Sequence, residues 1–142
     1  MFDILIGPVG AAALAGIVHF LIGAAWYSPS GFGGPWMRGL GITPEDIAEA
    51  RVDMRAALGA SAVASLAQAA VLVALFATLG LPGIAGGLLV GGLLGFAFGA
   101  LPMVKDRVWA DRAWSVVLVD GGYEIVAGAV AGGIAAALMG TA

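Results

Sequence analysis

The chain has 142 residues, of which 61% are hydrophobic and 11% are charged, with a formal net charge of −3 and no cysteine. A soluble domain carries about 25% charged residues, so this chain has too few to cover a globule in water. The lack of cysteine excludes disulfides and thiolate metal ligands, and six basic residues are too few for a nucleic-acid surface. The composition predicts an integral membrane protein in contact with the lipid bilayer and with no nucleic-acid partner.

Four apolar segments are long enough to cross a membrane as helices. They cover about residues 4–27, 56–79, 83–103 and 114–138, and each reaches the roughly 20 residues that a spanning helix needs. Loops at 28–55 and 104–113 carry most of the charge. We predict an all-α integral membrane fold, with a single transmembrane domain over residues 1–142 in which four helices form an antiparallel bundle.

The basic residues indicate the orientation of these helices. All six lie in the two charged loops, and the regions at the other side of the predicted bundle contain none. Because positive loops stay in the cytoplasm, both charged loops are expected there and both termini outside. The six are Arg38, Arg51, Arg55, Lys105, Arg107 and Arg112.

The first charged loop has two parts. Residues 28–41 are rich in glycine and proline and are predicted to be irregular. A helix is predicted to begin after Thr43, which is a suitable N-cap, and to run on into the second span. This short cytoplasmic helical extension would place Glu45, Glu49 and Asp53 in one stripe.

Small residues recur at four-residue spacing in the third and fourth spans. The chain contains 24 glycines, far more than the usual share of about 7%. Small residues at every fourth position allow two helix backbones to approach closely. We predict a glycine zipper, either within one bundle or between subunits. The residues assigned to helix packing are Gly83, Gly87, Gly91, Gly95, Gly99, Gly128 and Gly132.

Asp120 and Glu124 are the only charged residues of the fourth span, and they share one helix face. A charge at mid-bilayer costs at least ~2.5–3.5 kcal/mol on insertion scales, so such residues mark candidate functional sites. Because two carboxylates one turn apart repel each other, we expect at least one to be protonated at neutral pH. Three spans place polar groups at a similar depth. The candidate polar site contains Asp120, Glu124, His19, Gln68, Ser65, Ser61 and Tyr123.

The chemistry of this polar layer remains open from the sequence. His19 is expected either to pair with a carboxylate as an imidazolium or to stay neutral and hydrogen bonded. One histidine and two carboxylates are a poor set for a catalytic metal. Motifs typical of hydrolases and nucleotide-binding proteins are absent. We therefore predict no metal site, no cofactor and no enzymatic activity.

A motif of aromatic residues, glycine and proline follows the first span: Trp26, Tyr27, Ser28 and Pro29, then Phe32, Gly33, Pro35, Trp36 and Met37. With the Gly122-Tyr123 pair and the four-span layout, it resembles a small bacterial and fungal membrane family known as domain of unknown function 1761. The resemblance covers nearly the whole chain. It implies a four-helix membrane protein with no assigned activity, expected in a bacterial inner (plasma) membrane. We interpret the motif as an interfacial turn held by Trp and Tyr at the headgroups.

Three functions are compatible with these features. The leading prediction is a structural or interaction subunit that forms a homo-oligomer or joins a larger membrane complex. The alternatives are a proton-coupled transporter or channel that uses Asp120, Glu124 and His19, and a protein that binds a lipid or quinone. A cavity at the polar layer would favour transport or binding, whereas a dry and fully paired network would favour a structural role.

Overall fold

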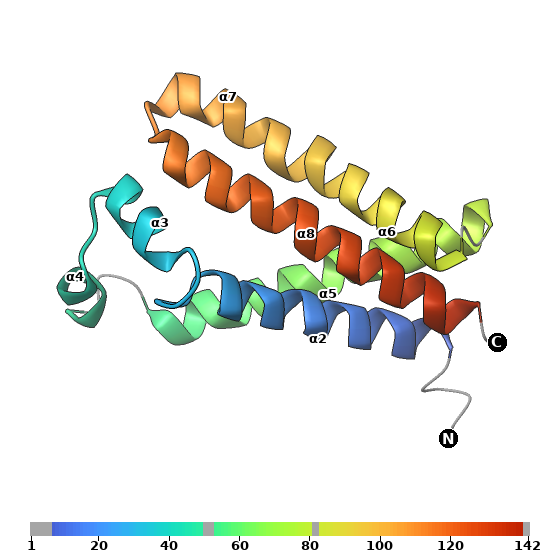
Figure 1. The fold of residues 1–142 in the computed structure, drawn as a ribbon. Helices are drawn as coiled ribbons and strands as arrows, with labels where there is room; N and C mark the ends of the chain where they lie inside the picture. The colour runs from blue at the N-terminus through green and yellow to red at the C-terminus, as the bar shows by residue number, and fades with distance from the viewer. Residues whose placement is uncertain (1–6, 50–52, 81–82, 141–142) are drawn as a thin grey trace.

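The computed structural model describes residues 7–49, 53–80 and 83–140, and in these residues the chain is all helical (Figure 1). Four helices are long and apolar enough to cross a membrane, as predicted, and the third is built from α6, η1 and α7. The expected helix start at Ile4, and Arg51, lie outside the described residues. The elements are α2 (Pro8–Trp26), α3 (Gly33–Leu40), α4 (Pro44–Ala48), α5 (Met54–Leu79), α6 (Gly83–Leu94), η1 (Gly95–Ala100), α7 (Leu101–Ala110) and α8 (Trp114–Met139).

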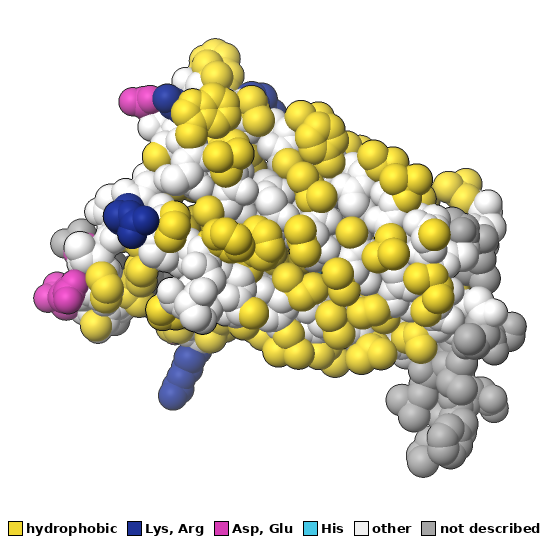
Figure 2. All heavy atoms as spheres, in the orientation of Figure 1, with side chains coloured by type: hydrophobic (Ala, Val, Ile, Leu, Met, Phe, Trp, Pro, Cys, Tyr) yellow, Lys and Arg dark blue, Asp and Glu magenta, His cyan; other side chains and the backbone are white. Residues whose placement is uncertain are grey.

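The long helices alternate in direction, so α2 begins and α8 ends at the same end of the bundle (Figure 1). The opposite end carries α3, α4 and the turn from α7 to α8, together with every described basic residue. We call it the basic end, and the other the neutral end. Figure 2 shows apolar side chains along the length of the bundle and charged ones at the basic end. Apolar side chains such as Leu118, at 70% exposed, therefore have lipid as their natural surroundings.

Helix α8 is the centre of the bundle. It packs against α2, α6, η1, α3 and α7, whereas α5 packs mainly against α2. Buried alanines of α2, α5 and α8 form the core together with Phe76 and Leu72 of α5. The small side chains allow α2, α5 and α8 to pack closely. Helix α6 packs against α8 and makes few direct contacts with α5.

Both charged loops contain more helix than predicted. The third helix does not end at Met103 but continues to Ala110 and includes Lys105 and Arg107, which are good helix formers. The chain then turns at Asp111, whose φ of 48° is in the left-handed region. The prediction of irregular structure at 28–41 was wrong over α3. There Gly39 allows the helix to lie against Ser115 of α8, and this packing overrides local propensity.

The predicted helical extension is a separate short helix. In α4, the Asp46 amide donates to Thr43 Oγ1 at 3.2 Å and the Thr43 amide donates to Asp46 Oδ2 at 2.9 Å, which is a capping box. Asp53 is the N-cap of α5, where its Oδ1 accepts from the Arg55 amide at 3.0 Å without a reciprocal bond. A new N-cap requires extended backbone, so α4 does not run into α5, and Glu45 and Asp53 are not on one helix.

Glycines bring the backbones of α6 and α8 into direct contact within one chain. A Cβ atom added at Gly128 would lie 2.7 Å from the carbonyl oxygen of Gly91. A Cβ atom added at Gly87 would overlap the carbonyl oxygen of Gly132, and one added at Gly91 would overlap that of Gly128. Gly83 does not belong to this contact. It has a φ of 69° and open space around it, because it begins the helix.

The π-helical segment η1 keeps this glycine face turned toward α8. In an α-helix of 3.6 residues per turn, each four-residue step rotates the face by about 40°. A π-helix has i→i+5 hydrogen bonds and a wider turn, which reverses that drift. As a result Gly95 and Gly99 still face α8, where added Cβ atoms would meet the backbone and side chain of Glu124.

Candidate functional site

The two carboxylates of α8 have different surroundings. Asp120 accepts a hydrogen bond of 2.7 Å from the Tyr27 hydroxyl, which comes from the residue directly after α2. The Tyr27 ring makes edge contacts with Trp36 of α3 at 5.4 Å and with Tyr123 of α8 at 5.5 Å between centroids. The Trp36 indole nitrogen is buried and has no hydrogen-bond partner among the described residues. Asp120 is thus held by Tyr27, whose ring packs against Trp36 and Tyr123.

The aromatic motif connects α2 to α8. The Trp26 indole donates to the carbonyl oxygen of Val119 at 3.0 Å, and its ring lies 4.6 Å from that of Phe32. A Cβ at Gly33 would overlap the Tyr27 carbonyl oxygen, so the turn tolerates only glycine there. The position of Trp26 and Tyr27 at the headgroups stays a prediction, and the structure adds that both side chains donate hydrogen bonds to α8. Their polar atoms find partners inside the bundle, which the sequence alone does not reveal.

His19 lies at the contact between α2, α5 and α8 and is only 3% exposed. Its Nδ1 atom lies 3.0 Å from Ser65 Oγ and 3.0 Å from the Tyr123 hydroxyl, which also donates to the His19 carbonyl oxygen at 3.3 Å. Its Nε2 atom makes no hydrogen bond to any described residue. The Nδ1 edge of the ring is therefore held in place, while the Nε2 edge is available for a further hydrogen bond.

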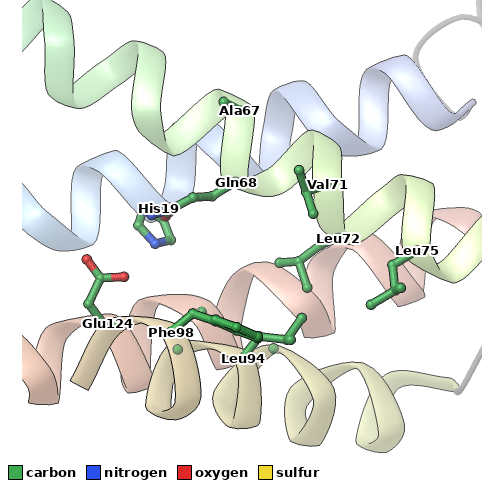
Figure 3. Close-up of a pocket in the computed structure, with 13 residues that line it drawn as sticks. His19, Ala67, Gln68, Val71, Leu72, Leu75, Leu94, Phe98 and Glu124 are labelled. Atoms are coloured by element: carbon green, nitrogen blue, oxygen red, sulfur yellow. The ribbon is translucent and has the colours of Figure 1, made fainter. Parts of the chain in front are cut away.

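Glu124 lines a cavity of about 510 Å³, which we call the lateral groove (Figure 3). The carboxylate and the His19 ring point toward each other at one end of it, and Gln68 lies beside His19. Glu124 makes no hydrogen bond or ion pair with a described residue, so of the two alternatives predicted for His19 the structure contains the hydrogen-bonded one and not an ion pair with Glu124. Apolar residues line the rest: Ala67, Val71, Leu72, Leu75, Gly91, Leu94, Gly95, Phe98, Gly99 and Gly128.

The predicted polar layer thus divides into an Asp120 cluster and a groove cluster, with Tyr123 between them. Ser61 belongs to neither. It is exposed, and its hydroxyl donates to the Ala57 carbonyl oxygen of the preceding turn at 2.9 Å. Among the described residues, no three His, Cys, Asp or Glu side chains are grouped to hold a metal ion.

Sequence reasoning missed Phe98 and the hydrogen bond between Tyr27 and Asp120. Phe98 is 78% exposed and lies in η1. The only available signal was its place between Gly95 and Gly99, where two glycines make an irregular helix turn easier. The partner of Asp120 had no local signal, since Tyr27 is 93 residues away.

The fold and these clusters define a four-helix membrane protein with polar side chains inside the bundle. The family model described as "Protein of unknown function (DUF1761)" matches residues 11–136, and the chain belongs to this family. The comparisons with curated proteins and with solved structures found no match.

Proposed function

We propose that the protein binds a lipophilic molecule in the lateral groove. The observation that carries this proposal is a cavity of about 510 Å³ with apolar walls and three polar side chains at one end: His19, Gln68 and Glu124. Ligand pockets typically measure about 300–1,000 Å³ and combine apolar walls with a few convergent polar groups. Both the size and the lining of the groove support a small-molecule ligand.

The groove is accessible from the lipid phase. Helix α5 packs against α2 and α8 but makes few contacts with α6, so the space between α5 and the third helix opens sideways. Ala67 and Val71 on α5 and Phe98 on η1 are exposed at this opening. A ligand dissolved in the acyl chains would reach the polar end of the groove without crossing water.

The depth of Glu124 limits the kind of ligand. Ten residues separate it from Trp114 at the start of α8, which places it about 15 Å along the helix. This depth is near the middle of a hydrocarbon layer of about 30 Å. A phospholipid headgroup does not reach that depth, whereas a quinone-like ring or another compact polar group on an apolar body does. The proposal therefore favours such a molecule over a membrane phospholipid.

Our proposal for the location is a bacterial inner membrane, with the basic end in the cytoplasm and both termini outside, as the positive-inside rule suggests. Because the chain has no cysteine, single cysteines can report on this orientation. Ser30→Cys at the basic end should resist a membrane-impermeant thiol reagent in intact cells, and Gly140→Cys at the neutral end should react. The reverse pattern would overturn the orientation.

The competing proposal is a structural subunit in which a helix of a second copy fills the groove. The sideways opening along α5 supports it, since such an opening also accommodates a helix. The polar end argues for a ligand instead, because an apolar helix would leave Glu124 without a partner in a dry interface.

Photolabelling tests the binding proposal. The purified protein in micelles is exposed to a benzoquinone with a diazirine-bearing ten-carbon chain, and labelled residues are mapped by mass spectrometry. We expect saturable labelling of groove residues such as Leu94. Val71→Trp should block it, because Val71 lines the groove, whereas Val63→Trp should not. Val63 is the matched control, because both valines lie on α5 and are similarly exposed, Val71 at 65% and Val63 at 68%.

Labelling that does not saturate, or that both variants leave unchanged, would overturn the binding proposal. A dimer of the wild-type protein, detected by chemical cross-linking, would support the structural subunit instead if Val71→Trp abolished it and Val63→Trp did not.

A further inference from the structure

We infer, on the basis of the proposed binding function, that the lateral groove selects a lipophilic cation whose positive group contacts Glu124. The geometry of the groove supports this ligand class in three ways: an unpaired carboxylate, a buried histidine with a free nitrogen, and an aromatic ring at the opening.

The carboxylate of Glu124 has no cationic partner in the part of the chain that the structure describes. No lysine or arginine lines the groove. Among the described residues, the one ion pair joins Arg107 to Asp111 at the basic end, away from the groove. An isolated carboxylate away from water is strongly unfavourable, so it must take up a proton or a positive ligand. An apolar cation can supply that charge from the lipid phase.

The groups that face Glu124 favour a positive ligand. Asp120 lies one turn away on α8 and adds negative potential. His19 from α2 is 97% buried and keeps its Nε2 edge toward the groove, where a neutral imidazole acts as a hydrogen-bond partner. Gln68 from α5 supplies an amide, and Tyr123 a hydroxyl that is already bonded to His19. Segment η1 contributes no charged side chain.

Phe98 adds an aromatic face at the groove opening (Figure 3). A cation within about 6 Å of an aromatic ring is attracted by the ring quadrupole, and the attraction grows when water is excluded. The walls formed by Leu72, Leu75 and Leu94 accommodate the apolar body of the ligand toward the neutral end. The groove thus offers a negative group, an aromatic ring and an apolar wall to one molecule.

Competition with the photoreactive quinone tests the inference. The two competitors are decyltrimethylammonium and the same chain ended by a tert-butyl group, which has the same shape and no charge. In the wild-type protein we expect the cation to compete at least about tenfold better than its neutral isostere, since a carboxylate in a low-dielectric site attracts it strongly. The preference should disappear in Glu124→Gln and persist in Asp106→Asn, an exposed acid on α7.

Acidification supplies a second measurement, because protons compete with the cation for the same carboxylate. The cation should lose potency as the pH falls while the neutral isostere keeps it. Equal potency of the two competitors, or a preference that survives in Glu124→Gln, would overturn the cation inference and leave the binding proposal intact. If the quinone itself shows no saturable labelling, the proposed function falls and the inference with it.

Discussion

Replacing Gly91 by alanine should push α6 away from α8. The added Cβ atom would lie 2.9 Å from the Gly128 carbonyl carbon and 3.2 Å from the Gly132 Cα atom, and closer still to the Gly128 carbonyl oxygen. All three neighbours are backbone atoms, so no side chain can rotate away. A gap of about 0.5–1 Å forfeits a quarter to a half of the dispersion energy of the contacts that it opens.

The expected loss of stability follows from this geometry. Overpacking of a tight interior costs about 1–3 kcal/mol, and the rigid neighbours of Gly91 suggest the upper part of that range. Gly59→Ala is the matched control, because Gly59 lies in a helix with nothing within 4 Å of its added Cβ. It should be neutral or should stabilise by up to about 1 kcal/mol through helix propensity.

Circular dichroism during titration of micelles with a denaturing detergent gives the free energy of unfolding of each variant. Gly91→Ala should unfold at a clearly lower denaturant fraction than the wild type, and Gly59→Ala should not. If both variants stayed within about 0.5 kcal/mol of the wild type, the close approach of α6 and α8 would be refuted.

Two further predictions concern polar contacts at the basic end. Tyr27→Phe removes the donor to Asp120 and should cost about 1–3 kcal/mol in the same unfolding assay, and an unchanged stability would contradict that hydrogen bond. Hydrogen bonds from the Thr43 amide and hydroxyl hold the pKa of Asp46 below its usual value. The carboxylate therefore stabilises α4 above the usual aspartate pKa and loses this effect as the pH falls through the lowered pKa. Amide protection in α4, taken relative to the intrinsic exchange rate at each pH, should fall over that range in the wild type, and Asp46→Asn should show no such step.

Much of the fold could be predicted from hydropathy, because lipid requires every backbone polar group to be satisfied inside the chain. That requirement turns four apolar segments into four helices without any knowledge of their neighbours. The glycine spacing likewise predicted a close contact, since Gly87, Gly91 and Gly128 have no side chain to keep the backbones apart. The short helix α3 was missed because its packing against α8 outweighs the poor helix propensity of its glycines and proline.

The division of the polar layer was decided only by the tertiary structure. Asp120 and Glu124 share a helix face, and a helix face alone does not distinguish them. Their surroundings differ because different elements pack against α8 at the two positions. At Asp120 the neighbour is Tyr27, directly after α2. At Glu124 the neighbour is the groove between α5 and η1. By itself, the sequence placed two carboxylates in an apolar helix. The packing of the other helices brings Tyr27 within hydrogen-bond distance of Asp120 and leaves Glu124 facing the groove. The groove is present because α5 packs mainly against α2 and α6 packs mainly against α8.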